Sequence, residues 1–449
     1  MNGHMNGSTE NVLNVKVISS FTAHRNDVLS VVWTGNMVAS GSADKTIRIW
    51  RINQKDEQNI ELHEVPFSPI ADHIYHVQCL HFSSFGTFLV ECSSDGVIMV
   101  WNTTTGKKIG QVNLPSNTIS AARTCRISPD SRYIAAGGDN DCVALWAFDK
   151  TAGLQLQKVY EGHEASVTCL CFTHDSAFIL SGGMAGDIRI WDRNKDQAIY
   201  IQRDAHDLGC TCMDIAPYKL NSPNGSTALH VASGGYDNTV KLWHLIELPN
   251  GNMKLAISPG NCHLKGHSGD ICSVRFANQT KLLISCSSDR TLFVWDPVKA
   301  VALKRVGPLT KYVRSCCFSS NDQFMMAGFS GGIVGFWRIS TNTGAAADVE
   351  PPVTITQAVN DNKIQLEFLD DDNAPSEFLC PVTNEIMRDP VIALDGISYE
   401  KTALEAWFKK GNSTSPTTNT ILSSQLFIPN VNLKLLIDRW HVTRKSSCA

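Results

Sequence analysis

The chain has 449 residues, of which 43% are hydrophobic and 18% charged, and its formal net charge is −4. This length predicts at least two domains, and the composition excludes a largely disordered chain. The nearly balanced charge gives no electrostatic basis for binding nucleic acid or an anionic membrane surface, so we expect neither as a partner.

The N-terminal segment and the cysteines indicate a compartment. Residues 1–14 are polar and have no apolar signal core, and no apolar run approaches the ~18 residues of a membrane span. The 15 cysteines are an odd number, and many lie inside apolar runs, as Cys169 and Cys171 do in VTCLCF. Such thiols are expected to be buried and reduced, which favours the cytoplasm or the nucleus.

Seven copies of one pattern fill residues 12–340. Each copy has a turn of small residues and then an alternating β-branched run that ends in tryptophan, which predicts a hairpin and a strand. The tryptophans are Trp50, Trp101, Trp146, Trp191, Trp243, Trp295 and Trp337. The pattern resembles the WD-repeat family, in which each unit of ~40–45 residues forms one four-stranded blade of a β-propeller.

This resemblance implies an all-β, seven-bladed propeller. We expect the N-terminal run VLNVKVISSF to pair with GIVGFW of the last copy, which would close the ring and remove a sheet edge. Because a propeller offers loop-lined faces and no catalytic constellation, the predicted role of this domain is recognition.

The blades of the family carry a buried polar network of a loop His, a strand Ser or Thr, a turn Asp and the Trp. Three copies match this pattern fully: His24, Ser40, Asp44 and Trp50; His206, Ser233, Asp237 and Trp243; His267, Ser285, Asp289 and Trp295. Ser, His and Asp also occur together in hydrolases, but a catalytic site need not recur. We therefore expect these groups to satisfy one another's buried polar atoms.

Four copies depart from the network. Glu91 replaces the Ser of copy 2, Asn140 replaces the Asp of copy 3, and Ala185 replaces the Asp of copy 4. Copy 7 lacks all three polar residues. These blades are expected to be held less tightly.

Exposed residues on one rim are candidates for binding a protein substrate. In the family, the residue before each turn Asp projects to one face, and Tyr236 holds this position in copy 5. Tyr312 and Arg314 lie near the same rim. The identity of the substrate is not encoded in these residues.

Residues 341–373 predict a linker, because the segment contains Thr, Asn, Gly and Ala, a Pro pair and an acidic end. The tail, residues 374–446, has two helix patterns. SYEKTALEAWFKKG predicts a helix with Glu400 in its first turn and Gly411 after its end, and IPNVNLKLLIDRW predicts a second helix capped by Asn430.

After residue 374 the only Cys and His residues are Cys380, His441 and Cys448. Since a zinc site needs about four ligands, we expect no metal and no cofactor.

The tail resembles a U-box, the zinc-free relative of the RING domain with a small α+β fold. The matching motifs are FLCPVTNEIMRDPVIALDGISYEK, ALEAWF, TSPTTNTIL and IPNVNLKLLIDRW. The resemblance implies a polar network in place of the metal, formed by Asp395, Ser398, Glu400 and Asn412. It also implies a groove for a ubiquitin-conjugating enzyme, formed by Val382, Asn384, Trp407 and Pro416, with Asn419 as a donor to that enzyme and to ubiquitin.

The two domains together resemble the WD-repeat, SAM and U-box domain-containing protein family, although the 33 residues between them leave no room for a SAM domain. The resemblance implies a ubiquitin ligase that acts without a covalent intermediate, with the propeller recruiting substrate. Cys380 is a poor nucleophile, because no base or cation lies near it in the sequence. The alternative is a non-enzymatic scaffold whose U-box only docks partners.

Overall fold

The computed structural model describes residues 12–54, 60–116, 120–221, 227–249, 251–257, 263–342, 356–358, 380–383, 387–393, 398–409, 414–416, 427–429 and 434. The chain divides into two compact units, Met1–Leu369 and Asp370–Ala449. The first unit contains strands β1 to β30, and the second contains β31 to β33 and helix α1. Within the described residues, no helix is both long enough and apolar enough to cross a bilayer.

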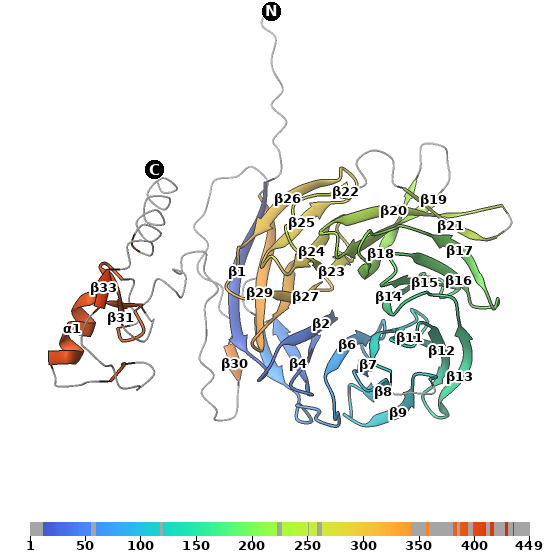
Figure 1. The fold of residues 1–449 in the computed structure, drawn as a ribbon. Helices are drawn as coiled ribbons and strands as arrows, with labels where there is room; N and C mark the ends of the chain where they lie inside the picture. The colour runs from blue at the N-terminus through green and yellow to red at the C-terminus, as the bar shows by residue number, and fades with distance from the viewer. Residues whose placement is uncertain are drawn as a thin grey trace, which may run out of the picture. The chain divides into compact units, whose positions relative to one another are not determined.

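The first unit is a ring of seven antiparallel sheets, so the predicted seven-bladed propeller is confirmed (Figure 1). Blade 1 consists of β2 (Val28–Thr34), β3 (Met37–Ser42), β4 (Ile47–Gln54) and β5 (Ile60–Glu64). Blade 2 consists of β6 (Val77–Phe82), β7 (Phe88–Ser93), β8 (Val97–Asn102) and β9 (Lys108–Asn113). Blade 3 consists of β10 (Ala122–Ile127), β11 (Tyr133–Gly138), β12 (Val143–Asp149) and β13 (Gly153–Tyr160). Blade 4 consists of β14 (Val167–Phe172), β15 (Phe178–Gly183), β16 (Ile188–Asp192) and β17 (Ala198–Gln202). Blade 5 consists of β18 (Cys210–Asn221), β19 (Thr227–Gly235), β20 (Val240–Glu247) and β21 (Met253–Ile257), with the short β22 (His263–Leu264) beside β20. Blade 6 consists of β23 (Ile271–Phe276), β24 (Leu283–Ser287), β25 (Leu292–Asp296) and β26 (Val301–Val306). Blade 7 consists of β27 (Val313–Phe318), β28 (Phe324–Phe329), β29 (Ile333–Asn342) and β1 (Val12–Thr22).

Each blade is most apolar near the centre of the ring. The second strand of a blade is buried along its length, as in β3 and β24, because neighbouring blades cover both of its faces. The outermost strand β26 is exposed at five of its six residues. The repeated tryptophans fill the space between blades, and Trp50, Trp191 and Trp337 are fully buried. The tryptophan pattern therefore marks the inter-blade core.

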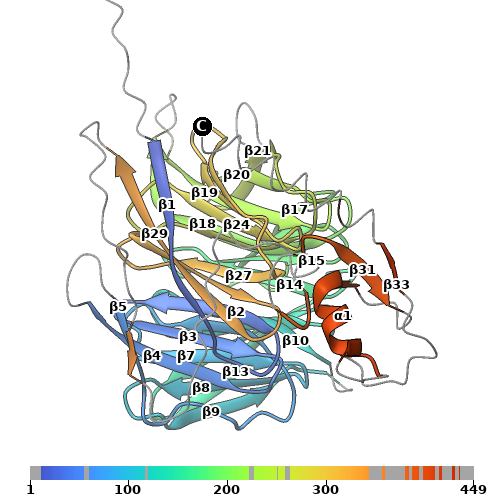
Figure 2. The same cartoon turned by 90° about the vertical axis from the view of Figure 1, so that its left-hand side faces the viewer.

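The ring closes as predicted, by the first strand of the chain pairing with the last strand of the propeller. β1 runs antiparallel to β29, with Val12 opposite Asn342 and Thr22 opposite Ile333 (Figure 2). Gly332 supports the closure, because its carbonyl accepts hydrogen bonds from the amides of Ala23 and His24. Gly332 has a φ of +83°, and a Cβ there would lie 1.9 Å from the His24 carbonyl oxygen, so only glycine fits.

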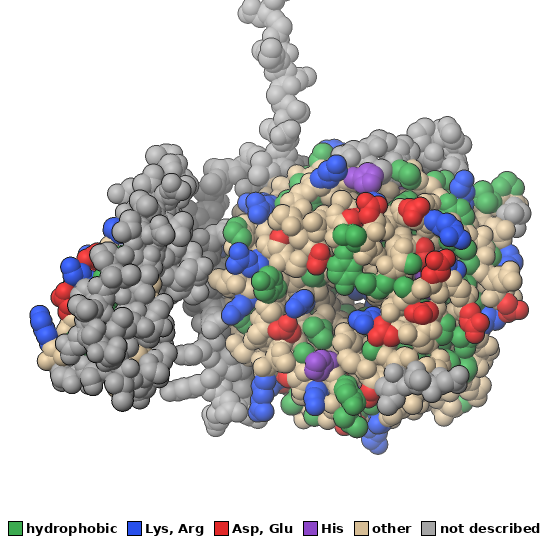
Figure 3. Space-filling view, viewed as in Figure 1, with side chains coloured by type: hydrophobic (Ala, Val, Ile, Leu, Met, Phe, Trp, Pro, Cys, Tyr) green, Lys and Arg blue, Asp and Glu red, His purple; other side chains and the backbone are tan. Residues whose placement is uncertain are grey.

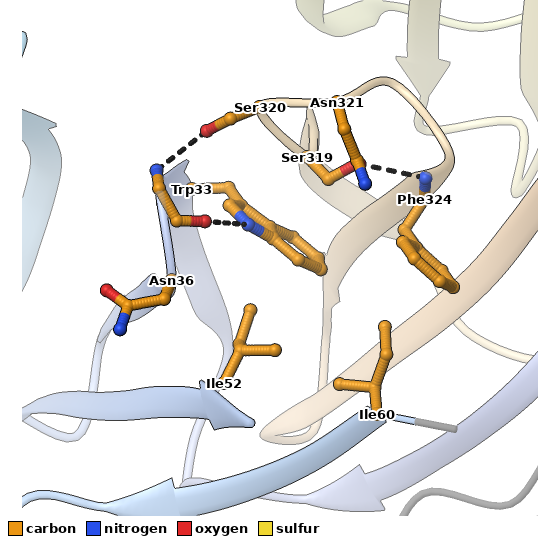
Figure 4. A pocket seen from close by; sticks show the side chains of 9 residues that line it. Trp33, Asn36, Ile52, Ile60, Ser319, Ser320, Asn321 and Phe324 are labelled. Carbon is orange, nitrogen blue, oxygen red and sulfur yellow. Dashed lines mark hydrogen bonds between the residues drawn. The ribbon is translucent and has the colours of Figure 1, made fainter. Parts of the chain in front are cut away.

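A cavity of about 160 Å³ lies between blades 7 and 1 (Figure 4). Trp33 stacks on Phe324, with ring centroids 6.3 Å apart and planes inclined by 8°. The amide of Gly35 donates to Ser320 Oγ at 2.7 Å. These contacts join the two blades between which the chain closes.

Three blades have the predicted polar contacts, with one difference. His24 Nε2 lies 2.7 Å from Ser40 Oγ, and the corresponding distances are 2.8 Å for His206–Ser233 and for His267–Ser285. In each blade the other imidazole nitrogen lies 3.0 Å from the turn aspartate: Asp44, Asp237 and Asp289. Trp243 and Trp295 donate to Ser233 and Ser285. Trp50 Nε1, in contrast, is buried without a hydrogen-bond partner among the described residues.

The expectation that blade 4 lacks its aspartate is wrong. His163 lies 3.1 Å from Asp187 Oδ1 and 2.7 Å from Ser181 Oγ, and Trp191 Nε1 donates to the same hydroxyl. Asp187 stands two residues after Ala185, at the end of the turn, and its carboxylate reaches back to the histidine. Blade 4 therefore contains a complete network.

Blade 2 replaces the serine with a buried acid. Glu91 is fully buried, accepts a hydrogen bond from Trp101 Nε1 and forms an ion pair with His73 Nε2. Burial raises the pKa of Glu91. Burial alone would lower the pKa of His73, but the hydrogen bond and the charge of Glu91 raise it. The longer acid side chain thus contacts both partners that a serine contacts in the other blades.

Part of the segment predicted as a linker forms a strand. β30 (Thr356–Ala358) pairs in parallel with β5, the outermost strand of blade 1, and Gln357 lies opposite Leu62. β30 is the fifth strand of that sheet.

The second unit contains a three-stranded sheet and a helix. β31 (Pro390–Ala393) pairs with both β32 (Ser398–Glu400) and β33 (Phe427–Pro429), and α1 spans Lys401–Lys409. Leu404 and Phe408 are the buried residues of α1, as the helix pattern predicts. Glu400 was expected in the first turn of the helix, but it is the last residue of β32. Of the second predicted helix, only Lys434 is described, and it is helical.

Candidate functional site

The U-box unit has a small core on which two loops are held: loop 1, described at residues 380–383, and loop 2, described at residues 414–416. Cys380, Tyr399 and Leu404 are fully buried, and Met387 and Val391 are almost so. The thiol of Cys380 accepts a hydrogen bond from the Glu400 amide at 3.2 Å. Cys380 therefore attaches the start of the first loop to the junction of β32 and α1.

Polar contacts hold both loops. Glu400 Oε2 accepts hydrogen bonds from the amides of Arg388 and Asp389 at 2.6 and 3.1 Å. The Tyr399 hydroxyl lies 3.2 Å from Ser415 Oγ, and both groups are buried. Trp407 Nε1 donates to the Thr414 carbonyl at 2.8 Å. The first contact fixes the chain after loop 1, and the other two fix loop 2 against β32 and α1.

Some of the residues predicted for this polar network can be placed. Glu400 makes two of its contacts, and Ser398 is half-buried on the same strand. Asp395 and Asn412 lie outside the described residues. The contacts of Tyr399 with Ser415 and of Trp407 with Thr414 were not predicted, because nothing in the local sequence distinguishes these groups from ordinary core residues. Among the described residues, no three His, Cys, Asp or Glu side chains gather as ligands for a metal ion.

Apolar residues remain outside this core. Val382, in the turn that follows Cys380, is 42% exposed. Trp407 and Pro416 are both half-buried, and the hydrogen bond from Trp407 to Thr414 brings the end of loop 2 to the indole. Asn384 and Asn419, predicted to border the same groove, lie outside the described residues. The arrangement presents apolar side chains on loops that hydrogen bonds hold in place, which suits the binding of another protein.

The propeller has a second group of exposed apolar residues on the loops that precede its inner strands and on the turns before its third strands. Tyr236 and Tyr312 are 38% and 52% exposed, and Arg314 is exposed and ion-paired with Asp27 at 3.3 Å. Ile74 and Leu208 lie in equivalent loops, are 71% and 65% exposed, and were not predicted. Their only sequence signal is an apolar residue in a polar loop.

Charges on the propeller are mixed. In the face shown in Figure 3, acidic and basic side chains are interspersed, with hydrophobic side chains between them. Such a surface suits a protein partner better than a polyanion, which needs an extended basic patch.

Two family models match the chain. The model described as "U-box domain" matches residues 374–446, and "WD domain, G-beta repeat" matches residues 15–51, 67–102, 113–147, 154–192, 199–244 and 260–296. No SAM domain was found. Strands β27, β28 and β29 of the seventh blade lie beyond the six matched repeats, but with β1 they complete the ring.

Curated relatives share both parts. WD repeat, SAM and U-box domain-containing protein 1 of Homo sapiens is 30% identical over 492 residues, which cover 96% of this chain and 100% of the relative. The protein of the same name from Danio rerio is 29% identical over 503 residues, with the same coverage. The chain belongs to this family. U-box domain-containing protein 20 of Arabidopsis thaliana is 46% identical over 66 residues, 15% of each chain. With its WD repeats and U-box, the chain falls among the U-box ubiquitin ligases.

Proposed function

We propose that the U-box binds a ubiquitin-loaded conjugating enzyme and promotes transfer of ubiquitin to a lysine of a substrate that the propeller recruits. The observation that carries the proposal is the placement of Val382, Trp407 and Pro416. Each remains outside the U-box core, on an element that hydrogen bonds fix to β32 or α1. A fixed apolar surface binds a partner with a small loss of conformational entropy.

The chemistry of this reaction needs no attacking group from this chain. The thioester belongs to the conjugating enzyme, and the attacking amine belongs to the substrate. The contribution of the U-box is positional, since it holds the reacting groups in one orientation. Cys380 is fully buried and its thiol accepts a backbone hydrogen bond, so it is poorly placed to accept ubiquitin.

Substrate recruitment rests on the exposed rim residues of the propeller. Tyr236, Tyr312 and Arg314 combine aromatic surface with a charge, and these residue types are enriched where proteins bind one another. Leu208 and Ile74 extend the apolar part of the surface. The substrate is therefore expected to be a folded protein or peptide with an apolar anchor.

A reconstituted ubiquitination assay tests the proposal. Full-length protein is combined with activating enzyme, ubiquitin, ATP and a broad panel of conjugating enzymes, and chain formation is followed. We expect stimulation with at least one enzyme and its loss in Val382→Arg, because a charge replaces an apolar contact. Val298→Arg is the matched control: Val298 is an exposed valine of the propeller, 52% accessible, and its replacement should leave chain formation unchanged.

The same assay separates the alternatives. Cys380→Ser should retain chain formation within about twofold, since the hydroxyl still accepts the amide hydrogen bond. A loss of activity in a Cys380→Ser protein that remains folded would instead indicate a covalent role. If no conjugating enzyme in the panel is stimulated, the protein acts as a scaffold.

A further inference from the structure

The innermost strands of the seven blades surround the centre of the ring (Figure 1). The fifth residue of each strand defines a set that we call the basic ring: Val32, His81, Arg126, Cys171, Asp214, Arg275 and Cys317. Electrostatic interactions cross the ring, since the charges of Arg126 in blade 3 and Arg275 in blade 6 both lower the pKa of His81 in blade 2. The basic ring therefore gathers its charges around one shared space, the central channel.

Among the described residues, the two arginines of this ring form no direct ion pair, although the charge of Asp214 acts on both from a longer distance. Arg126 is only 8% exposed, and its Nη1 donates to Cys79 Sγ at 3.2 Å and to the Cys125 carbonyl at 2.9 Å. Arg275 Nη1 donates to the Val274 carbonyl at 3.2 Å. Within the part of the chain that the structure describes, neither guanidinium has a carboxylate oxygen within 4.0 Å. A guanidinium carries five N–H donors, and buried charges are normally paired.

The other end of the same strands provides a contrast. The second residue of each inner strand lies at a β-bulge, where the register shifts. Arg123 and Arg314 hold this position in blades 3 and 7, and each has a carboxylate. Arg123 pairs with Asp139 at 2.5 Å, and Arg314 pairs with Asp27 at 3.3 Å. Among the inner strands, which the structure describes in full, the arginines without a carboxylate partner are thus the two of the basic ring.

The neighbouring groups leave no excess negative charge beside the two arginines. Asp214 Oδ2 accepts the Phe276 amide at 2.8 Å, and burial raises the pKa of this carboxyl. Burial, with Arg126 and Arg275, holds the pKa of His81 well below its usual range, so the imidazole is uncharged at neutral pH. The Cys79 thiol contacts Arg126, and a hydrogen bond from Cys125, with help from Arg126, lowers its pKa. Even a thiolate and a carboxylate together would only balance the two guanidiniums, leaving no excess negative charge.

We propose that the basic ring binds a small anion that carries phosphate groups, held by Arg126 and Arg275 inside the central channel. Phosphate oxygens match the planar donors of two guanidiniums, which can each form paired hydrogen bonds with them. His81 and Asp214 are half-buried, so solvent reaches the site. The neutral imidazole can donate one further hydrogen bond. The Asp214 carboxyl opposes a bound anion when ionised, and a protonated carboxyl would donate instead.

Calorimetric titration of the full-length protein tests the site. Inorganic phosphate, ATP and inositol hexakisphosphate are titrated separately in phosphate-free buffer, with the ionic strength held constant by chloride. We expect at least one of them to bind with a Kd below about 1 mM and to raise the Tm by about 2 °C at saturation. The three probes distinguish a free phosphate from a nucleotide and from a polyphosphorylated ring.

Variants assign the binding to the basic ring. Arg126→Met and Arg275→Met should each weaken binding about tenfold or more, because each removes charged hydrogen bonds. Arg123→Met, at the bulge of the same inner strand as Arg126, should bind as the unchanged protein does. Arg275 is half-buried, so Arg275→Met provides the test even if Arg126→Met does not fold. The proposal is overturned if none of the three probes binds, if binding survives in Arg275→Met, or if Arg123→Met loses it equally.

Discussion

The polar network of blade 4 allows a quantitative test of how these propeller blades are held. Ser181 Oγ contacts both His163 Nε2 and Trp191 Nε1 at 2.7 Å, and all three groups are buried. Ser40 occupies the same place in blade 1, but its only partner in the network is His24, at 2.7 Å. Replacing each serine with alanine therefore removes two buried hydrogen bonds in blade 4 and one in blade 1.

The expected cost follows from the groups left without partners. A buried donor or acceptor that loses its partner costs about 1–3 kcal/mol. Ser181→Ala leaves an indole N–H and an imidazole nitrogen unpaired, which gives about 2–6 kcal/mol. Ser40→Ala leaves one imidazole nitrogen unpaired, which gives about 1–3 kcal/mol by the same principle. The loss in blade 4 should exceed that in blade 1 by about 1 kcal/mol or more.

Thermal unfolding of the two variants, followed by circular dichroism, checks this difference. For a domain of this size, about 1 kcal/mol lowers the Tm by roughly 2 °C. Ser181→Ala should therefore unfold at least about 2 °C below Ser40→Ala. Equal Tm values, or a larger drop for Ser40→Ala, would refute the reasoning that the number of buried hydrogen bonds sets the stability of a blade.

Three further predictions concern pH, metal and the added strand. Burial opposes ionisation of Asp44, Asp237 and Asp289, but hydrogen bonds from the blade histidines dominate and hold each pKa below the ordinary 3.8. Each folded pKa lies below the unfolded one, so these carboxylates stabilise the fold above about pH 4, and the Tm should fall steeply below it. Asp44→Asn should flatten that profile. A strong chelator should leave the Tm of the U-box unchanged within error, since hydrogen bonds of Glu400, Tyr399 and Trp407 hold its loops; a clear decrease would refute this. Gln357→Pro should break the pairing of β30 with β5 and speed amide exchange in Ile60–Glu64, with no change expected in the other outer strands.

The number of blades and the closure of the ring could be predicted because they depend on strong local signals. Each tryptophan ends a β-branched run, and this local pattern survives where the polar network is lost. Blade 7 shows this well. It has none of the three polar residues, yet Trp337 is fully buried and β29 pairs with β1.

The network of blade 4 was missed because the copies were compared position by position. A hydrogen bond requires that a carboxylate reach the imidazole, and Asp187 does so from two residues beyond the usual place. Arg189 Nε also donates to Asp187 at 2.5 Å. In blade 2, the longer side chain of Glu91 likewise reaches the histidine and the tryptophan from the position of a serine. Sequence position thus gives the residue type to look for, but side-chain reach decides which residue forms the contact.

The basic ring could not be recognised from any single segment, because its members are contributed one per blade. Arg126 and Arg275 are 149 residues apart in the sequence, and each follows an apolar or small residue in an otherwise ordinary inner strand. Only the alignment of all seven inner strands puts them at one level of the channel. The same alignment separates them from Arg123 and Arg314, which have carboxylate partners. In a repeat fold, residues at one equivalent position of successive repeats can therefore form a site together. No sequence motif marks such a site, because the residue types at that position differ from one repeat to the next.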